Sequence, residues 1–286
     1  MLLNMKNLLS VAKDNHFAVP AFNISDYSMF LAVMKAAEAE NAPVIIEIHP
    51  HELSFTGTDI AQAIISRAHK SPVPVVLHMD HGGSYEDCMI AIRSGFTSVM
   101  IDASSKSFEE NVATTKKVVE AAHAVDVSVE AELGTIGVTT SVEAYENQTI
   151  LYTKVEDAVE FVKETGVDTL AIAIGTSHGL YPKGMTPHLR LDILDDISNA
   201  LNIPLVLHGG SGNPDDEIAE AVKRGISKIN ISSDLKNAYF MKMREVLENK
   251  KLLEPNKIEP ACIDAACEVV VHKIRLFNAD NKADLY

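Results

Sequence analysis

The chain has 286 residues, a mass of 31.1 kDa and a formal net charge of −15, and 47% of its residues are apolar. This apolar content supports a large buried core and excludes a disordered chain. The acidic balance excludes the overall positive field that attracts nucleic acid or anionic membranes, so an anionic substrate needs a local binding site.

The first residues and the cysteines bear on the compartment. Residues 1–17 combine a short apolar stretch with charged residues and have no small-residue cleavage site, which predicts a short helix and not a signal peptide. No run of about 18 apolar residues occurs, so we expect no membrane span. Cys88, Cys262 and Cys267 form neither a disulfide framework nor a CxxC motif, which suits the reducing cytoplasm.

Short apolar runs alternate with longer amphipathic stretches along the whole chain. The predicted strands are 17–24, 43–48, 73–80, 97–102, 127–133, 169–175, 203–210 and 227–232. The helices predicted between them include 29–42, 60–69, 85–94, 108–124, 155–164 and 217–223. Eight such units predict a (β/α)8 barrel that forms a single domain over 1–286, with extra N- and C-terminal helices. A doubly wound sheet would have fewer strands and a glycine-rich turn after the first strand, and FNISDY (22–27) has no glycine.

Three predicted strands alternate polar with apolar residues. The polar positions are His78 and Asp80, then Ser128, Glu130 and Glu132, then Lys228, Asn230 and Ser232. The outer face of a barrel strand lies beneath helices, so these side chains should point into the barrel. Glu130 and Lys228 fit an interior ion pair as well as a functional role. Active sites of barrels lie at the carboxyl ends of the strands, so the other polar residues at strand ends, together with Asp102, predict a functional site there.

Three histidines lie at the carboxyl ends of predicted strands. His81, His178 and His208 are each followed by a glycine, which lets the backbone and a ligand approach closely. A lone histidine at such a position is more often structural, whereas three that converge fit a divalent metal with an open coordination position. The histidines interpreted as surface or packing residues are His16, His69, His123, His188 and His272.

Two segments predict an anion site. The HGGSG sequence at 208–212 offers the backbone N–H groups of Gly209, Gly210 and Ser211, and the segment 230–234 opens the last predicted helix of the barrel, whose N-terminus favours a phosphate. Either segment alone could simply turn the chain. Barrels commonly build a phosphate site from the loops after strands seven and eight, so together they favour phosphate.

A metal beside a phosphate site, with Asp80 between them, predicts a definite chemistry. A 2-keto phosphate can chelate the metal, which then stabilises an enediolate as a Lewis acid. Asp80 adjoins His81 in the chain and is placed to carry a proton to or from a second carbonyl. This equipment suits reversible aldol cleavage and condensation.

Six segments together resemble one family. They are HMDHGG (78–83), VMIDASS (99–105), EAELGTIG (130–137), AIGTSHGLY (173–181), LVLHGGSG (205–212) and KINISSDL (228–235). In order and spacing they resemble the class II, zinc-dependent ketose-bisphosphate aldolases, in the fructose- and tagatose-bisphosphate branch, over essentially the whole chain. The resemblance implies a (β/α)8 barrel, a homodimer or homotetramer, and dihydroxyacetone phosphate as the ketone half of the substrate.

The resemblance also implies roles for individual residues. His81, His178 and His208 match the Zn²⁺ ligands, and Asp80 matches the catalytic acid and base at the aldehyde carbonyl. Asp102 and Glu132 match carboxylates that orient the metal ligands or hold an alternative metal position. The implied substrate-binding residues are Asn23, Gly179, Gly209, Gly210, Ser211, Asn230, Ser232 and Ser233. A sodium or potassium ion near the phosphate is a further expectation of the resemblance.

The chain departs from the family pattern at three places. Family members carry a proton-removing glutamate shortly after the EAELGTIG segment, where this chain has VTTS, and we assign that role to Glu143, with Glu146 as the alternative. Small residues after the second strand are replaced by His49-Pro50-His51, which either face the substrate or form an unrelated cluster.

The third departure concerns a second phosphate. The fructose-bisphosphate enzymes have aspartate where this chain has Ser232, and an arginine before the last helix is replaced at Asn256. Loss of a bidentate arginine weakens recognition of a second phosphate. We therefore expect an aldolase whose aldehyde lacks a terminal phosphate.

Three other functions compete with this interpretation. A barrel hydrolase with zinc-activated water normally has an HxH pair at the end of the first strand, and FNISDY has no histidine. A Schiff-base aldolase would use Lys228 as its nucleophile and need no metal. A non-catalytic protein that binds a metal or a sugar phosphate would account for the missing loop acids.

Overall fold

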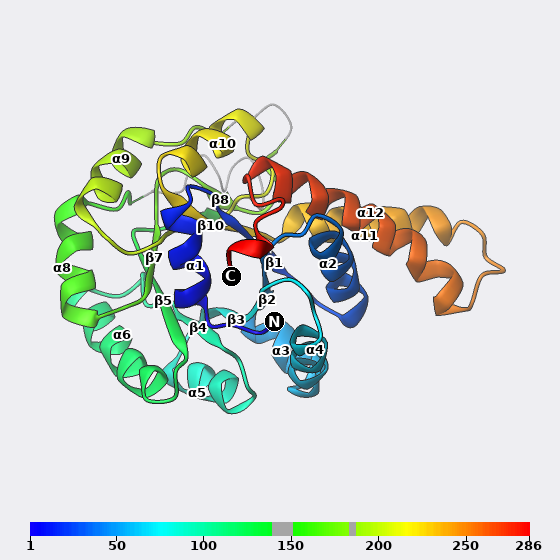
Figure 1. Cartoon of the computed structure of the whole chain (residues 1–286), viewed down its shortest axis with the longest axis horizontal. Coiled ribbons are helices and arrows are strands. Elements are labelled where there is room, and N and C mark those ends of the chain that lie inside the picture. The colour runs from blue at the N-terminus through cyan, green and yellow to red at the C-terminus, as the bar shows by residue number, and fades with distance from the viewer. Residues whose placement is uncertain (139–150, 183–186) are drawn as a thin grey trace.

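Eight parallel strands close into a barrel (Figure 1) in the computed structural model, which describes residues 1–138, 151–182 and 187–286. In order around the barrel the strands are β1 (Val19–Asn23), β10 (Ile226–Ile231), β9 (Leu205–Leu207), β7 (Thr169–Ile172), β5 (Ser128–Leu133), β4 (Ser98–Ile101), β3 (Val75–Gly82) and β2 (Val44–Ile48). Each predicted run overlaps one barrel strand, with β3 ending two residues later and β10 beginning one residue earlier than predicted, so the predicted (β/α)8 architecture is confirmed. Two further strands, β6 (Gly137–Val138) and β8 (Ser177–His178), form a small separate sheet.

Helices surround the barrel (Figure 1). They are α1 (Met5–Asp14), α2 (Tyr27–Ala39), α3 (Pro50–Thr56), α4 (Asp59–His69), α5 (Tyr85–Arg93), α6 (Phe108–His123), α8 (Val155–Thr165), α9 (Leu191–Ala200), α10 (Asp215–Lys223), α11 (Ser233–Val246), α12 (Pro255–Leu276) and the short 3₁₀ helix Ala283–Leu285. Side-chain caps set several of their starts: Asp26 caps α2, Ser84 caps α5, and Ser107 forms a capping box with Glu110 at α6. Within the described ranges, no helix is both long and apolar enough to cross a membrane.

The last two long helices form an arm. α11 and α12 run side by side and extend away from the barrel, and the chain turns between them at the outer end of the arm (Figure 1). Asn256 lies in the first turn of α12 and is exposed. The position where the family pattern has an arginine is therefore at the outer end of this arm, remote from the barrel of its own chain.

The amino ends of the strands are covered by the start of the chain. The Lys6 backbone N–H donates to Ser128 Oγ over 2.9 Å, and the Leu3 N–H donates to the Val75 carbonyl over 2.9 Å. Both acceptors are the first residues of barrel strands. Because α1 and the residues before it lie at this end, the open end of the barrel is the one where the strands finish.

The barrel interior contains a buried ion network. Lys228 of β10 places its Nζ 2.7 Å from Glu47 Oε1 of β2 and 2.9 Å from Glu130 Oε2 of β5, and all three side chains are fully buried. These strands lie in different sectors of the barrel, so the side chains meet only by pointing inward. The predicted inward direction of these polar side chains is confirmed, and Glu130 and Lys228 form the expected interior ion pair.

Replacement of Lys228 by methionine should destabilise the fold strongly. The change leaves Glu47 and Glu130 buried without their shared cation, and breaking one partner of a buried pair costs about 3–5 kcal/mol. Equilibrium unfolding in urea measures the loss. The matched control is Lys35→Met, because Lys35 and Asp264 form an exposed pair, and its unfolding midpoint should stay unchanged. An unchanged midpoint for Lys228→Met would contradict the importance of the network.

Candidate active site

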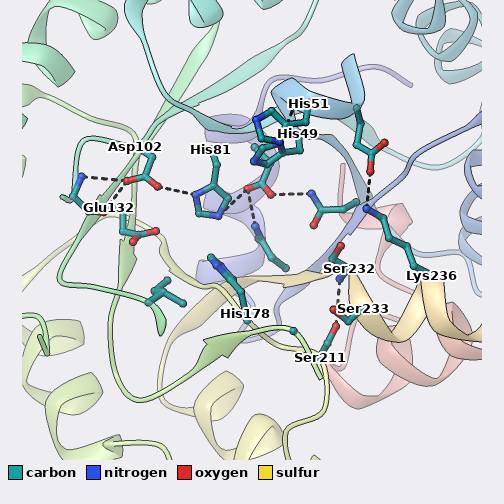
Figure 2. Close-up of a pocket in the computed structure, with 18 of the residues that line it drawn as sticks. His49, His51, His81, Asp102, Glu132, His178, Ser211, Ser232, Ser233 and Lys236 are labelled. Atoms are coloured by element: carbon teal, nitrogen blue, oxygen red, sulfur yellow. Dashed lines mark hydrogen bonds and ion pairs between the residues drawn. The ribbon is translucent and has the colours of Figure 1, made fainter. Parts of the chain in front are cut away.

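A cavity of about 800 Å³ opens at the carboxyl ends of the strands. Its wall includes Asn23 at the end of β1, His81 on β3, Asp102 after β4, Glu132 on β5 and Asn230 on β10. Figure 2 shows the histidines in the middle of the cavity, with Asp102 and Glu132 on one side and Ser211, Ser232 and Ser233 on the other. Apart from His208 and Gly210, which are buried and do not belong to its wall, the site residues predicted within the described ranges line this one cavity.

A backbone irregularity lets two consecutive residues face this cavity. In a regular strand Asp80 and His81 would point to opposite faces, but His81 has φ of +51° and the pairing of β3 with β4 shifts register between Met79 and Gly82. A Cβ atom on Gly82 would lie 2.5 Å from the Met100 carbonyl oxygen, so only glycine permits this close approach of β3 to β4. The irregularity brings His81 beside the end of β4.

The three predicted metal ligands converge. The ring centroids of His81 and His178 are 5.0 Å apart, those of His81 and His208 are 4.7 Å apart, and those of His178 and His208 are 6.1 Å apart. One nitrogen from each ring lies within 4.8 Å of the other two. Gly209 contributes to this convergence, because its φ of +63° and missing Cβ let the chain pass the Ser177 carbonyl of β8, next to His178.

Two of the imidazoles are held from behind by carboxylates. His81 Nδ1 lies 2.9 Å from Asp102 Oδ2, and His208 Nε2 lies 2.7 Å from Glu130 Oε1. The remaining nitrogens, His81 Nε2 and His208 Nδ1, face each other at 3.0 Å. A carboxylate behind each imidazole, with the other nitrogen facing a common point, is the arrangement that orients histidines on a metal ion.

Asp102 and Glu132 differ in their contacts. Asp102 Oδ1 accepts from the backbone N–H and the hydroxyl of Ser104 at 3.1 and 2.7 Å, so both of its oxygens are held. Glu132 Oε2 is buried, has no hydrogen-bond partner among the residues that the structure describes, and lies 3.7 Å from His208 Nδ1. The geometry supports an orienting role for Asp102 and leaves Glu132 available to a cation.

The electrostatics of the cluster favour a single central positive charge. Burial opposes the charge on His81, but Asp80 and the hydrogen bond to Asp102 outweigh it and raise the pKa of His81 to about 10. Burial, and next the charge on His81, lowers the pKa of His178 to about 3. Burial also lowers the pKa of His208, which gives two neutral imidazoles, the form that binds metals. Burial, with the charge of Asp102, raises the pKa of Glu132 to about 8. The donor set therefore fits a divalent cation.

Asp80 is a buried carboxylate held by two amides. Its Oδ2 accepts from Asn23 Nδ2 at 2.8 Å and its Oδ1 accepts from Asn230 Nδ2 at 3.0 Å. Burial opposes its charge, but His81 and then His208 outweigh it and hold the pKa of Asp80 well below its usual range. An ionised, oriented carboxylate 3.8 Å from His81 Nε2 is placed to accept a proton beside a metal.

The predicted anion site takes shape around Ser211. Ser211 Oγ accepts from the backbone N–H groups of Ser232 and Asp234 at 3.3 and 3.2 Å, which leaves its hydroxyl hydrogen to donate to a ligand. These amides lie at the N-terminus of α11, which favours an anion. Gly179, Gly209, Ser211, Ser232 and Ser233 all line the cavity.

One amide of the predicted anion site is engaged elsewhere. The Gly210 N–H donates to the Asn230 carbonyl at 3.0 Å, so the expectation that this amide faces the anion was wrong. The reason is that the HGGSG segment, which follows β9, continues the backbone hydrogen bonding between β9 and β10. A Cβ atom on Gly210 would lie 2.4 Å from Ile229 Cγ2, so the glycine is needed for packing.

Sequence analysis missed part of the cavity wall. Glu52 and Lys236 line it and bind each other, with Lys236 Nζ 2.9 Å from Glu52 Oε1. Lys236 could have been found from its position one turn into the helix that opens at Ser233, whereas nothing local marks Glu52. His49 and His51 also line the cavity, so of the two alternatives for these histidines the geometry supports the substrate-facing one.

The remaining predicted residues lie elsewhere. The histidines interpreted as surface or packing residues are absent from the cavity wall, and three of them pair with carboxylates outside it: His123 with Asp168, His188 with Glu217 and His272 with Asp215. Glu143 lies outside the described residues.

Comparisons with known proteins agree with the geometry. Residues 3–282 match the family model described as fructose-bisphosphate aldolase class-II. The chain is 41% identical to a fructose-bisphosphate aldolase of Staphylococcus aureus, over 99% of both chains. It is 40% identical to a 6-phospho-5-dehydro-2-deoxy-D-gluconate aldolase of Bacillus licheniformis, over 98% of this chain and 96% of the relative. The crystal structure of the YdjI aldolase from Escherichia coli K12 superposes with a TM-score of 0.88 at 36% identity, over 99% of this chain and all of that one.

Replacement of Asp102 by asparagine should weaken metal binding. The change keeps the size of the side chain and removes the charge behind His81 Nδ1, and such outer partners typically contribute about 10–100-fold to metal affinity. Competition with a chromophoric chelator measures the zinc affinity. Asp192→Asn is the matched control, because Asp192 pairs with Arg190 on the surface. Equal zinc affinities for the two variants would contradict the orienting role of Asp102.

Proposed function

Because the chain belongs to the class-II fructose-bisphosphate aldolase family, we propose that it cleaves and forms a ketose phosphate or ketose bisphosphate by a reversible aldol reaction, with dihydroxyacetone phosphate as the ketone half. The observation that carries the proposal is the convergence of three imidazoles beside Asp80, in a cavity that Ser211 and the N-terminus of α11 also line. The two curated relatives are named for different substrates, so their names support the reaction class and leave the substrate open.

The proposed cofactor is Zn²⁺, held by His81, His178 and His208. When bound, the metal supplies Lewis-acid stabilisation of negative charge on substrate oxygens. Asp102 and Glu130 orient two of its ligands, and the buried Glu132 Oε2 supports an alternative metal position. A sodium or potassium ion near the phosphate is part of the proposal on family grounds.

The residues of the chain divide the remaining work. The phosphate of the ketone half lies against Gly179, Gly209, Ser211, Ser232 and Ser233, which together with Asn23 and Asn230 form the proposed substrate-binding set. Gly210 supports this loop by packing. The amides and the helix N-terminus provide the local anion site that a chain with a net charge of −15 requires.

Asp80 moves the proton at the aldehyde end. During cleavage it accepts the hydroxyl proton as that carbon becomes the aldehyde carbonyl, and during condensation it returns the proton. Asn23 and Asn230 fix both of its oxygens while it does so. Glu143 is proposed to remove the carbon-bound proton of the ketone half in the condensation direction.

The contacts of Lys228 argue against a Schiff-base mechanism. A nucleophilic lysine must be neutral, whereas burial of Lys228 is outweighed by Glu130 and then Glu47, which raise its pKa above the usual value. The ammonium group is held between the two carboxylates at the centre of the barrel.

We propose that the enzyme works in the cytoplasm as a homodimer or homotetramer.

Proton exchange tests the proposed reaction. The zinc-loaded protein, mixed with dihydroxyacetone phosphate in deuterated water, should exchange one carbon-bound proton, followed by NMR, without any aldehyde present. A chelator should stop the exchange and borohydride should not inactivate the enzyme. A protein that binds dihydroxyacetone phosphate without exchange would support the non-catalytic alternative.

Three variants separate the proposed proton carriers. Asp80→Asn should lower aldol condensation by about 10²–10⁴-fold while exchange continues, because Asp80 acts on the aldehyde half only. Glu143→Gln should lose both reactions, and Glu146→Gln, the alternative acid, should keep both. If Asp80→Asn lost proton exchange to the same extent as aldol condensation, the division of roles would be contradicted.

The aldehyde half is proposed to lack a terminal phosphate. Asn256 is exposed in the first turn of α12, and Ser232 stands where the fructose-bisphosphate enzymes carry aspartate. Neither residue supplies the bidentate guanidinium that recognises a phosphate well.

Comparison of two aldehydes of equal length tests this preference. With dihydroxyacetone phosphate as the partner, kcat/KM for glyceraldehyde should equal or exceed kcat/KM for glyceraldehyde 3-phosphate. A preference of roughly a hundredfold or more for the phosphorylated aldehyde would contradict it, because a site built to bind a group rejects an analogue without it by such factors.

A further inference from the structure

One sector of the cavity wall has no role in the reaction derived above. It consists of His49, Glu52 and Lys236, called here the distal wall, and Ser25 binds Glu52. It adjoins Asp80 through Asn23, which binds Asp80 and lies two residues before Ser25 in the chain. Because Asp80 is proposed to act at the aldehyde carbonyl, this wall borders the part of the cavity next to the proposed aldehyde site.

Glu52 is anchored at the centre of the distal wall. Its Oε1 accepts from Ser25 Oγ at 2.8 Å and from Lys236 Nζ at 2.9 Å. Burial opposes its charge, but the hydrogen bonds from Lys236 and Ser25 outweigh it and lower the pKa of Glu52. The side chain is 27% exposed, so a charged carboxylate borders the cavity.

The same contact neutralises the one cation of the wall. Lys236 lies in the first turn of α11, on the side of the cavity where Figure 2 shows Ser232 and Ser233. With its ammonium group bound to Glu52, the pair contributes no net charge. Lys236 therefore does not offer the free positive charge that a second phosphate needs.

His49 adds a neutral donor. Its Nδ1 accepts from the His51 backbone N–H at 3.1 Å, so the proton of the neutral ring is on Nε2. The ring centroid lies 6.2 Å from that of His81, close to the reacting centre.

We propose that Glu52, paired with Lys236, determines specificity for the aldehyde half by admitting a hydroxylated, uncharged end and rejecting a terminal phosphate. A hydroxyl group both donates and accepts, so it matches a wall that holds a carboxylate, an ammonium group and a neutral N–H. A phosphate only accepts and is negatively charged, and the neutral pair of Glu52 and Lys236 offers it no net positive charge. This inference rests on the proposed aldol reaction and assigns its selectivity to a residue pair.

Two single substitutions should move the selectivity in opposite directions. The quantity measured is the ratio of kcat/KM for glyceraldehyde 3-phosphate to kcat/KM for glyceraldehyde, with dihydroxyacetone phosphate as the partner. Glu52→Gln keeps the shape and the Ser25 contact and frees the charge of Lys236, so the ratio should rise by roughly tenfold or more. Lys236→Met leaves Glu52 unpaired, so the ratio should fall by a similar factor.

A matched control and the parent reaction make the outcomes distinct. Glu38→Gln removes the carboxylate of a comparable half-exposed pair with Arg67, outside the cavity wall, and should leave the ratio unchanged. Absence of proton exchange by the wild-type enzyme with dihydroxyacetone phosphate would overturn the proposed reaction itself. If the wild-type enzyme exchanges the proton but the kcat/KM ratios of the two variants equal the wild-type ratio, only the role of the pair is overturned. The same holds if both ratios change in the same direction. That second result would also be expected if Lys236 served the phosphate of the ketone half.

Discussion

The structure depends on one buried carboxylate that serves both the barrel and the cavity. Glu130 binds the Lys228 ammonium group on one side and His208 Nε2 on the other. Burial opposes the charge on Glu130, but Lys228 and the hydrogen bond to His208 keep its pKa at about 2. Because the charge inside a closed barrel must be neutralised where it lies, the orientation of His208 is coupled to the packing of the barrel interior.

The same rule organises the rest of the cavity. Asp102 holds His81, and Asn23 with Asn230 holds Asp80, so each reacting or ligating group has a partner that fixes its direction before any ligand arrives. The proposed anion site follows a different rule, since Ser211 and the N-terminus of α11 take the place of cationic side chains there. This division allows a strongly acidic chain to bind an anion without adding cationic side chains beside the metal ligands.

Much of this arrangement could be predicted from the sequence. The alternation of apolar runs with amphipathic stretches predicted the barrel, because a strand buried beneath helices requires apolar residues on its outer face. The alternation of polar and apolar residues along the strands placed Glu130, Lys228 and Asp80 inside the barrel. The positions of His81, His178 and His208 at strand ends predicted their convergence. Glu52 and Lys236 could not be paired from the sequence, because their contact joins α3 to α11 across 184 residues with no shared pattern.

The sequence by itself determined which residues face the barrel interior, because side chains alternate between the two faces of a strand. It also determined which residues lie at the open end, because these residues follow the predicted strands in the chain. Only the tertiary structure decided how those residues divide their contacts. In the folded chain the Gly210 N–H donates to the Asn230 carbonyl, and Lys236 forms an ion pair with Glu52. The positive φ of His81 lets both Asp80 and His81 face the cavity. Each of these depends on distances between strands and helices that are remote in the chain, and such distances leave no local periodicity in the sequence.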